Sequence, residues 1–177
     1  MNIFYLHKNA KENAKMHCDK HVVKMCTEYA QLLSTAHRVL DGEWYTALSK
    51  NNRKINRWLF NDYREEKIYQ GAYVNHPCTV WVRESKANYS LLFDLYFELL
   101  AEYNYRYGKI HGASKPLDCL MFPPDNILDL PLSELPQCMP DYCKIADKPL
   151  DAYRKYYINE KNSFAKWKCR ETPEWYT

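Results

Sequence analysis

The sequence predicts a mostly α-helical fold, a single compact helical domain over residues 1–177 with a short N-terminal extended segment and a proline-rich connector. Two observations predict this class. Apolar residues recur at helical spacing in two long stretches, at about 10–40 and 77–107. The composition, with 46% hydrophobic and 27% charged residues among 177, is that of one soluble globular domain. No run approaches the ~18 consecutive apolar residues of a membrane span, so we expect no membrane partner.

The N-terminal half is predicted to contain an extended segment and two helices. The apolar run Ile3–Leu6 is predicted to be a strand or an extended arm. A long helix should follow at about 10–40, capped by Asn9 or Asn13 and stopped at Gly42. A second helix is predicted at about 46–60, followed by an irregular loop at 61–76.

The C-terminal half is predicted to be one long helix, a connector and a helical end. Pro77 suits a first helical turn, and Gly108 suits the end of that helix. Six prolines between residues 116 and 140 then mark a connector at about 112–149, with short helical turns around 115–121 and 132–137. The basic and aromatic C-terminus, 150–177, is expected to form helices at about 150–158 and 159–168.

The most informative stretch is a stripe of titratable residues on the first long helix. Their positions follow i, i+4, i+7 and i+11, which places them on one side of a helix, next to an apolar face. Groups at the edge of a buried face are those whose pKa values neighbours can shift toward neutrality. The stripe, our set of candidate catalytic residues, consists of His17, His21, Lys24 and Glu28. The alternative is a helix with edge histidines and one Lys–Glu pair.

Two kinds of chemistry fit this stripe. A neutral Lys24 amine would be a nucleophile able to form a Schiff base with a sugar C1′, while His21 or Glu28 moves protons. Alternatively, Lys24 is a surface lysine paired with Glu28. The second chemistry uses a metal, because His17 and His21 have the H-x-x-x-H spacing of zinc hydrolases. The glutamate that follows the first histidine in such enzymes is replaced by Cys18, and a third ligand would have to come from His76, Glu28 or Glu84.

Basic residues interleaved with aromatic ones predict a nucleic-acid surface more strongly than the net charge of +3 does. Six basic residues against one acidic residue lie between 154 and 170, and a second basic cluster lies at 50–57. A polar cluster at the predicted helix start near residue 77 suits a phosphate. The alternatives are a solvated helix face and a capping turn. The candidate nucleic-acid-binding residues are Arg53, Arg57, His76, Arg83, Asn88, Arg154, Lys161, Lys166, Trp167, Arg170 and Trp175.

The cysteines predict a reducing compartment. There are seven, an odd number, without a Cys-x-x-Cys spacing and without a signal-peptide pattern at the N-terminus. We therefore expect free thiols in a cytoplasmic protein (in the host cytoplasm if the chain is phage-encoded), with no structural zinc and no cofactor.

The layout resembles the pyrimidine-dimer DNA glycosylases of the phage endonuclease V type. In that family a short N-terminal segment leads into a helix with a His-Leu-x-x-Glu-His/Tyr-x-Glu pattern, and residues 17–24 here read His-Cys-Asp-Lys-His-Val-Val-Lys. A long central helix and an aromatic tail, here 172–176, complete the resemblance. Lys24 stands in the place of the family's catalytic glutamate. The family's nucleophile is the α-amine of a small residue, whereas residue 2 here is Asn, which usually leaves Met1 in place. The chain also looks like an uncharacterised group of tailed-phage proteins.

The resemblance implies a DNA-binding base-excision enzyme, a glycosylase with or without AP-lyase activity, with DNA as its partner. Two alternatives stay open. One is a non-catalytic nucleic-acid-binding protein that uses the same surfaces, and the other is a metal-dependent hydrolase built on His17 and His21.

Overall fold

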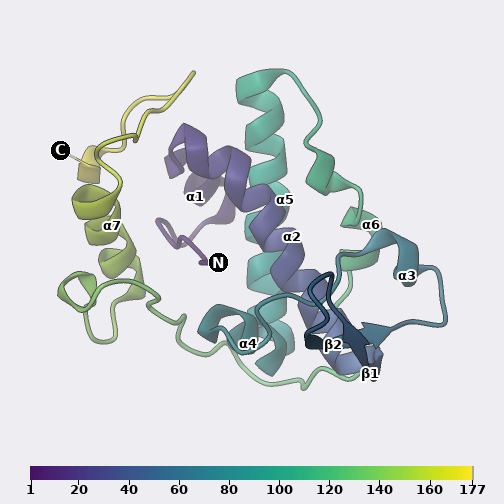
Figure 1. Cartoon of the computed structure of the whole chain (residues 1–177). Helices are drawn as coiled ribbons and strands as arrows, with labels where there is room; N and C mark the ends of the chain where they lie inside the picture. Colours follow the sequence, from purple (N-terminus) through teal and green to yellow (C-terminus); the bar gives the residue numbers. More distant parts are fainter. Residues whose placement is uncertain (177) are drawn as a thin grey trace.

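The computed structural model describes residues 1–176, which are largely helical with one small two-stranded sheet (Figure 1). The mostly helical class is confirmed to this extent. Within this part of the chain, no helix is both long enough and apolar enough to cross a membrane. The elements are α1 (Ala10–Met16), α2 (Asp19–Asp41), β1 (Glu43–Leu48), β2 (Lys54–Leu59), α3 (Arg64–Lys67), α4 (Pro77–Glu84), α5 (Lys86–Tyr107), α6 (Leu117–Leu120) and α7 (Pro149–Glu160), with short 3-10 turns at Gly112–Ser114, Asp141–Cys143 and Glu174–Tyr176.

The core lies around two long helices, α2 and α5, which run side by side through the middle of the molecule (Figure 1). The helix α1 packs on α5, while α4 packs on both α2 and α5. The N-terminal segment 1–7 lies between α2 and α7, and Ile3, Phe4 and Leu6 are buried there. It has no regular secondary structure and pairs with no strand of the described chain.

The helix predicted at 10–40 is two helices, with a break at His17 and Cys18. In a continuous helix the carbonyl of Asn13 would accept the backbone N–H of His17. Here the His17 ring takes that carbonyl through Nδ1 at 2.8 Å, and the His17 backbone N–H turns to Ala14 instead. The prediction of Asn9 as a cap is confirmed, because its side chain accepts the backbone N–H of Glu12.

The helix predicted at 77–107 is also interrupted, at Ser85. Its backbone is extended, with φ −150° and ψ 156°, and its side chain caps α5 by accepting the N–H of Asn88. Both predicted ends are confirmed. Pro77 opens α4, and Gly108 follows α5 with a positive φ of 63°, a conformation in which glycine carries no steric cost.

The helix predicted at 46–60 is wrong, because this stretch lies in a β-hairpin formed by β1 and β2. Tyr45 pairs with Arg57, and Leu48 pairs with Lys54. Aromatic and β-branched residues favour strands, and the turn between them reaches a positive φ of 56° at Asn52. Basic side chains at 50–57, which suggested a helix face, therefore stand on a ribbon.

The base of the hairpin is anchored to the core by Trp58. Its ring packs on Gly71, where an added Cβ would lie 3.1 Å from the ring, and its backbone carbonyl accepts a hydrogen bond of 2.9 Å from Arg38. Arg38 is fully buried in α2 and also contacts the carboxylate of Glu65. Because these contacts hold the base of the hairpin, the rest of the ribbon can extend into solvent.

The predictions for the C-terminal region are partly confirmed. The short turn predicted at 115–121 corresponds to α6, and the helix predicted at 150–158 corresponds to α7. The turn at 132–137 is not helical, and of the helix at 159–168 only 159–160, the end of α7, is helical. Pro131 directly precedes the first of these stretches and Pro136 lies within it. In the second, the Lys166 carbonyl accepts the N–H of Asp19, and the Trp167 indole donates to the carbonyl of Met16, so that its groups bond to α1 and α2 rather than to a helix.

A buried ion network joins the N-terminal helices, α5 and the C-terminal tail. The Arg106 side chain is fully buried and binds Glu102 at 2.7 Å and Asp19 at 2.9 Å. Glu102 also binds Arg170 of the tail at 2.8 Å. The two arginines lower the pKa of Glu102 although burial alone would raise it. Each charge in the network therefore depends on its partners.

We predict that Glu102→Ala destabilises the fold by about 3–5 kcal/mol, because it leaves the buried Arg106 without its closest partner. Urea denaturation measures this loss as a difference in the free energy of unfolding. Glu98→Ala, on the same helix but outside the network, is the control and should change stability by only about 0.5 kcal/mol. Equal losses in the two variants would contradict the assigned role of the network.

Candidate functional site

The two histidines of the predicted catalytic stripe lie inside the core rather than at its edge. His17 is fully buried, and His21 is only 5% exposed. The His21 ring stacks on Phe4, with ring centroids 4.2 Å apart, and its Nδ1 is hydrogen-bonded to the hydroxyl of Tyr157. Burial lowers the pKa of His17 to about 4 and that of His21 to about 2. Both rings are therefore neutral near pH 7.

The hydrogen bonds of His17 define its tautomer. A backbone carbonyl only accepts, so Nδ1 must carry the proton that it donates to the carbonyl of Asn13. The other nitrogen, Nε2, then accepts from the hydroxyl of Tyr29 at 3.2 Å. With both ring nitrogens occupied, His17 has no lone pair to offer a metal unless this network opens. The geometry therefore does not support His17 as a metal ligand of a metal-dependent hydrolase.

The rest of the stripe lies on the surface of α2. The Lys24 side chain is 66% exposed and forms an ion pair of 3.0 Å with Glu28, whose side chain is only 14% exposed. The desolvation that would activate a lysine nucleophile is therefore absent from the isolated protein. Glu28 and the α-amine of Met1 lie near His76, since the charges of both affect the pKa of this histidine, which burial lowers. Lys24 is linked to this region through its ion pair with Glu28.

The β1–β2 hairpin is the most exposed of the predicted nucleic-acid surfaces. Arg53 lies in its turn and Arg57 in β2, with Lys50 and Lys54 beside them. Trp44 and Tyr45 were not among the predicted contacts, because they precede the stretch 46–60 that the sequence predicted to be a helix. Large apolar side chains stand in solvent on both strands, namely Trp44 (59% exposed), Tyr45 (42%), Leu48 (64%) and Leu59 (40%).

Several other predicted nucleic-acid contacts are held by the protein itself. Arg83 donates to the carbonyl of Val74, and Asn88 is fully buried against Trp81 and Ser133. His76 caps α4 through Nδ1. In these three residues the structure shows the capping and packing roles that the sequence left open as the alternative.

The same holds for most of the C-terminal candidates. Arg154 donates to the carbonyl of Leu6 and stacks over the ring of Trp175. Arg170 binds Glu102, and Lys161 binds the hydroxyl of Tyr156 at 3.0 Å. Both indoles bond to Met16, from Trp167 to its carbonyl oxygen and from Trp175 to its sulfur. Lys166 is exposed.

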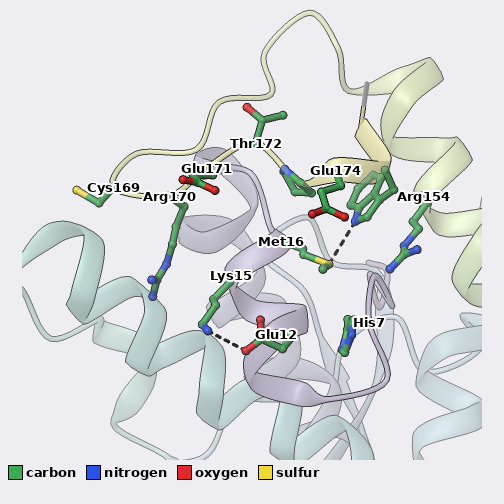
Figure 2. Close-up of a pocket in the computed structure, with 12 residues that line it drawn as sticks. His7, Glu12, Lys15, Met16, Arg154, Cys169, Arg170, Glu171, Thr172 and Glu174 are labelled. Carbon is green, nitrogen blue, oxygen red and sulfur yellow. Dashed lines mark hydrogen bonds and ion pairs between the residues drawn. The ribbon is translucent and has the colours of Figure 1, made fainter.

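A pocket of ≈ 730 Å³ lies between α1 and the C-terminal tail (Figure 2). Figure 2 shows Lys15 turned to Glu12, while Arg170 reaches down toward the helices below. The lining of the pocket contains four basic or imidazole side chains and three carboxylates. The basic side chains are already bonded to other groups of the protein. The pocket therefore has no excess positive charge for a phosphate. The charged lining residues are His7, Lys15, Arg154, Arg170, Glu12, Glu171 and Glu174.

His37 of α2 is a buried titratable residue that the sequence analysis did not single out. Its Nε2 is hydrogen-bonded to the Tyr89 hydroxyl at 2.8 Å, and that hydroxyl donates to the carbonyl of Leu120. His37 therefore donates through Nε2. Burial lowers its pKa to about 4, although the carboxylate of Asp41 acts in the opposite direction.

No protein-family model, no curated protein and no solved structure matches this chain. The roles of these residues are therefore argued from their own geometry, and the resemblance to DNA glycosylases stays a prediction.

We predict that the protein loses stability as the pH falls from 6.5 to about 4, the interval between the ordinary histidine pKa and the lowered values of His17 and His37. The unfolded chain binds protons in this interval, whereas the buried rings stay neutral. The free energy of unfolding should therefore fall by about 1.4 kcal/mol per pH unit for each such histidine. Urea denaturation between pH 7 and pH 4.5 measures the slope.

The variant that tests this explanation is His17→Gln. It should reduce the slope in that interval by about 1.4 kcal/mol per pH unit, the contribution of one proton. His7→Gln, which removes a partly exposed imidazole, serves as the control. If the His17→Gln protein keeps the wild-type slope, the buried histidines do not cause the pH dependence.

Proposed function

We propose that this chain is a DNA-binding protein and that the β1–β2 hairpin is its main contact with DNA. The observation that carries the proposal is the exposure of three basic residues, Lys50, Arg53 and Lys54, together with Trp44 and Tyr45 on one hairpin, where Arg57 is partly exposed. Only Trp58 of the two strands is buried in the core, so the fold itself does not explain the apolar side chains on the ribbon. Exposed apolar patches of this kind are typical of binding surfaces.

The shape and charge of the ribbon suit a duplex. The major groove of B-DNA admits a two-stranded β-ribbon, and basic side chains beside it bind phosphates and release counterions. In the register of the hairpin Tyr45 lies opposite Arg57, which places a ring next to a guanidinium on the same face. A ring beside a positive charge can contact a sugar or a base while the charge contacts phosphate.

We predict that the double variant Arg53→Ala/Arg57→Ala binds duplex DNA more weakly and with a shallower salt dependence. Loss of two phosphate contacts should lower the slope of log K against log salt concentration by about 2. Fluorescence anisotropy with a labelled duplex at several salt concentrations measures this slope.

The matched control is Lys8→Ala/Lys11→Ala, which removes the same charge from exposed positions at the start of α1, outside the hairpin. It should leave the slope nearly unchanged. A similar loss in both double variants would mean that only net charge matters and that the hairpin is not the interface. Absence of DNA binding by the wild type would overturn the proposal altogether.

A second candidate function, base excision, is favoured by the ion pair of 3.0 Å between Lys24 and the partly buried Glu28. The charges of Glu28 and of the Met1 α-amine both act on the pKa of His76. An amine nucleophile forms a bond to the sugar C1′ as the glycosidic bond breaks and the base leaves with a proton. The C1′–O4′ bond of the sugar then opens, O4′ takes up a proton, and the nitrogen loses its own proton to give an imine. The partly buried Glu28 carboxylate is suited to accept the proton of the amine. Bound DNA would cover Lys24 and supply the desolvation that the free protein lacks.

We predict that borohydride traps a covalent adduct between the protein and a duplex carrying a damaged base, and that Glu28→Gln abolishes it. Peptide mass spectrometry would locate the adduct at Lys24 or at the Met1 α-amine. Glu12→Gln is the matched control, because Glu12 forms a similar surface ion pair of 2.7 Å with Lys15 on α1.

The remaining outcomes separate the two functions. Released base without an adduct would indicate a glycosylase that uses water as its nucleophile. Normal DNA binding with neither adduct nor released base from a panel of damaged duplexes would overturn base excision and leave the hairpin proposal standing.

A further inference from the structure

Two cysteines and a histidine from distant parts of the sequence meet beside the N-terminal segment. His76 precedes α4, Cys78 lies in its first turn, and Cys138 belongs to the connector 60 residues later. One potential ligand atom from each residue lies within 4.8 Å of the others. Among residues 1–176, this is the group of His, Cys, Asp and Glu side chains whose geometry could hold a metal ion.

We propose that His76, Cys78 and Cys138 form a binding site for a thiophilic divalent cation, with Zn²⁺ as the best match. Two thiolates and an imidazole are ligands that zinc prefers, and a set of three protein ligands leaves one of four tetrahedral positions open. The inference is independent of the proposed function, because it requires neither DNA binding nor base excision.

The distance between the sulfurs fits one shared ion. The Sγ atoms of Cys78 and Cys138 are 3.5 Å apart. Two thiolates on a tetrahedral zinc, each with a Zn–S bond of about 2.3 Å, lie about 3.8 Å apart. A disulfide would require about 2.05 Å. A shift of a few tenths of an ångström is thus enough to place both sulfurs on a zinc ion.

Neighbouring residues hold the ligands in place, and the site is accessible to an ion from solvent. Asn2 donates from Nδ2 to the carbonyl of Cys138 at 2.8 Å, and its Oδ1 lies 3.8 Å from the sulfur of Cys78. The hydroxyl of Tyr153 fixes the same Oδ1 at 2.6 Å. Residues that orient ligands in this way raise metal affinity. Cys78 is buried, whereas His76 and Cys138 are partly exposed, so an ion can reach the site from solvent.

One existing contact competes with the metal. Nδ1 of His76 accepts the backbone N–H of Cys78 at 3.2 Å, and coordination through Nδ1 would replace this bond. The bond is at the long end of the hydrogen-bond range and joins neutral groups, so its loss costs much less than a zinc–imidazole bond contributes. Binding also requires both thiols to lose their protons, and the affinity should therefore rise with pH.

The test uses the full chain, freed of metal with a chelator and kept reduced with a phosphine, and titrated with Co²⁺ as a spectroscopic probe. We expect one Co²⁺ per chain, with a thiolate-to-metal charge-transfer band that Zn²⁺ displaces. Cys138→Ser should weaken binding by more than about 100-fold, because loss of a residue that only orients a ligand already costs 10–100-fold. Cys169→Ser, at an exposed cysteine, is the matched control and should bind as the wild type does.

A second readout keeps the proposal falsifiable if a variant folds poorly. Zn²⁺ should raise the melting temperature of the wild type and of Cys169→Ser but not of Cys138→Ser, a substitution at a partly exposed position. No charge-transfer band in the reduced wild type, or equal affinity in Cys138→Ser, would overturn the site. A peptide map that links residues 78 and 138 by a disulfide, together with no metal binding after reduction, would overturn it in favour of a redox pair.

Discussion

The rest of the structure depends on how the buried N-terminal segment satisfies its backbone. Residues 1–7 have no regular secondary structure, and Ile3, Phe4 and Leu6 are buried in the core, but no neighbouring strand of the described chain offers the segment hydrogen bonds. Buried backbone groups without partners are costly, so side chains must replace the strand. The Oδ1 of Asn13 accepts the N–H groups of Leu6 and His7, and the hydroxyl of Tyr29 accepts that of Phe4. The segment is thus hydrogen-bonded to side chains of both α1 and α2, a set of bonds that we call the N-terminal clamp.

Both titratable clusters follow from this clamp. The Tyr29 hydroxyl that accepts from the segment also donates to His17, so the same atom bonds to the backbone of Phe4 and to a buried imidazole. At the other end of the segment, Asn2 holds the connector at Cys138 next to the first turn of α4. The histidine cluster therefore serves the packing of the core, whereas the cysteine cluster, which is partly exposed, remains accessible to a ligand.

The sequence predicted much of the helical fold but little of the site, for identifiable physical reasons. Periodicity found the stretches of α2 and α5, since it reports which faces are buried. It missed the break at His17, which arises because a ring takes the carbonyl that a helix would use. The ion pair of Lys24 with Glu28 is local and could be predicted from spacing, although the exposure of Lys24 could not. Basic and aromatic composition does not distinguish a tail that packs on Met16 from a ribbon that stands in solvent.

The arrangement along α2 bears on how binding and chemistry relate. Lys24 and the start of the hairpin are separated by about 18 residues of helix, or about 27 Å at 1.5 Å per residue. One turn of B-DNA is about 34 Å long, so a duplex of modest length is long enough to span both. The hairpin is anchored through Trp58 and Arg38 rather than through the N-terminal segment. Changes in its exposed side chains should therefore leave Lys24 and its ion pair with Glu28 intact. The two proposed functions therefore rest on separate parts of the molecule, which allows each to be judged by its own variants.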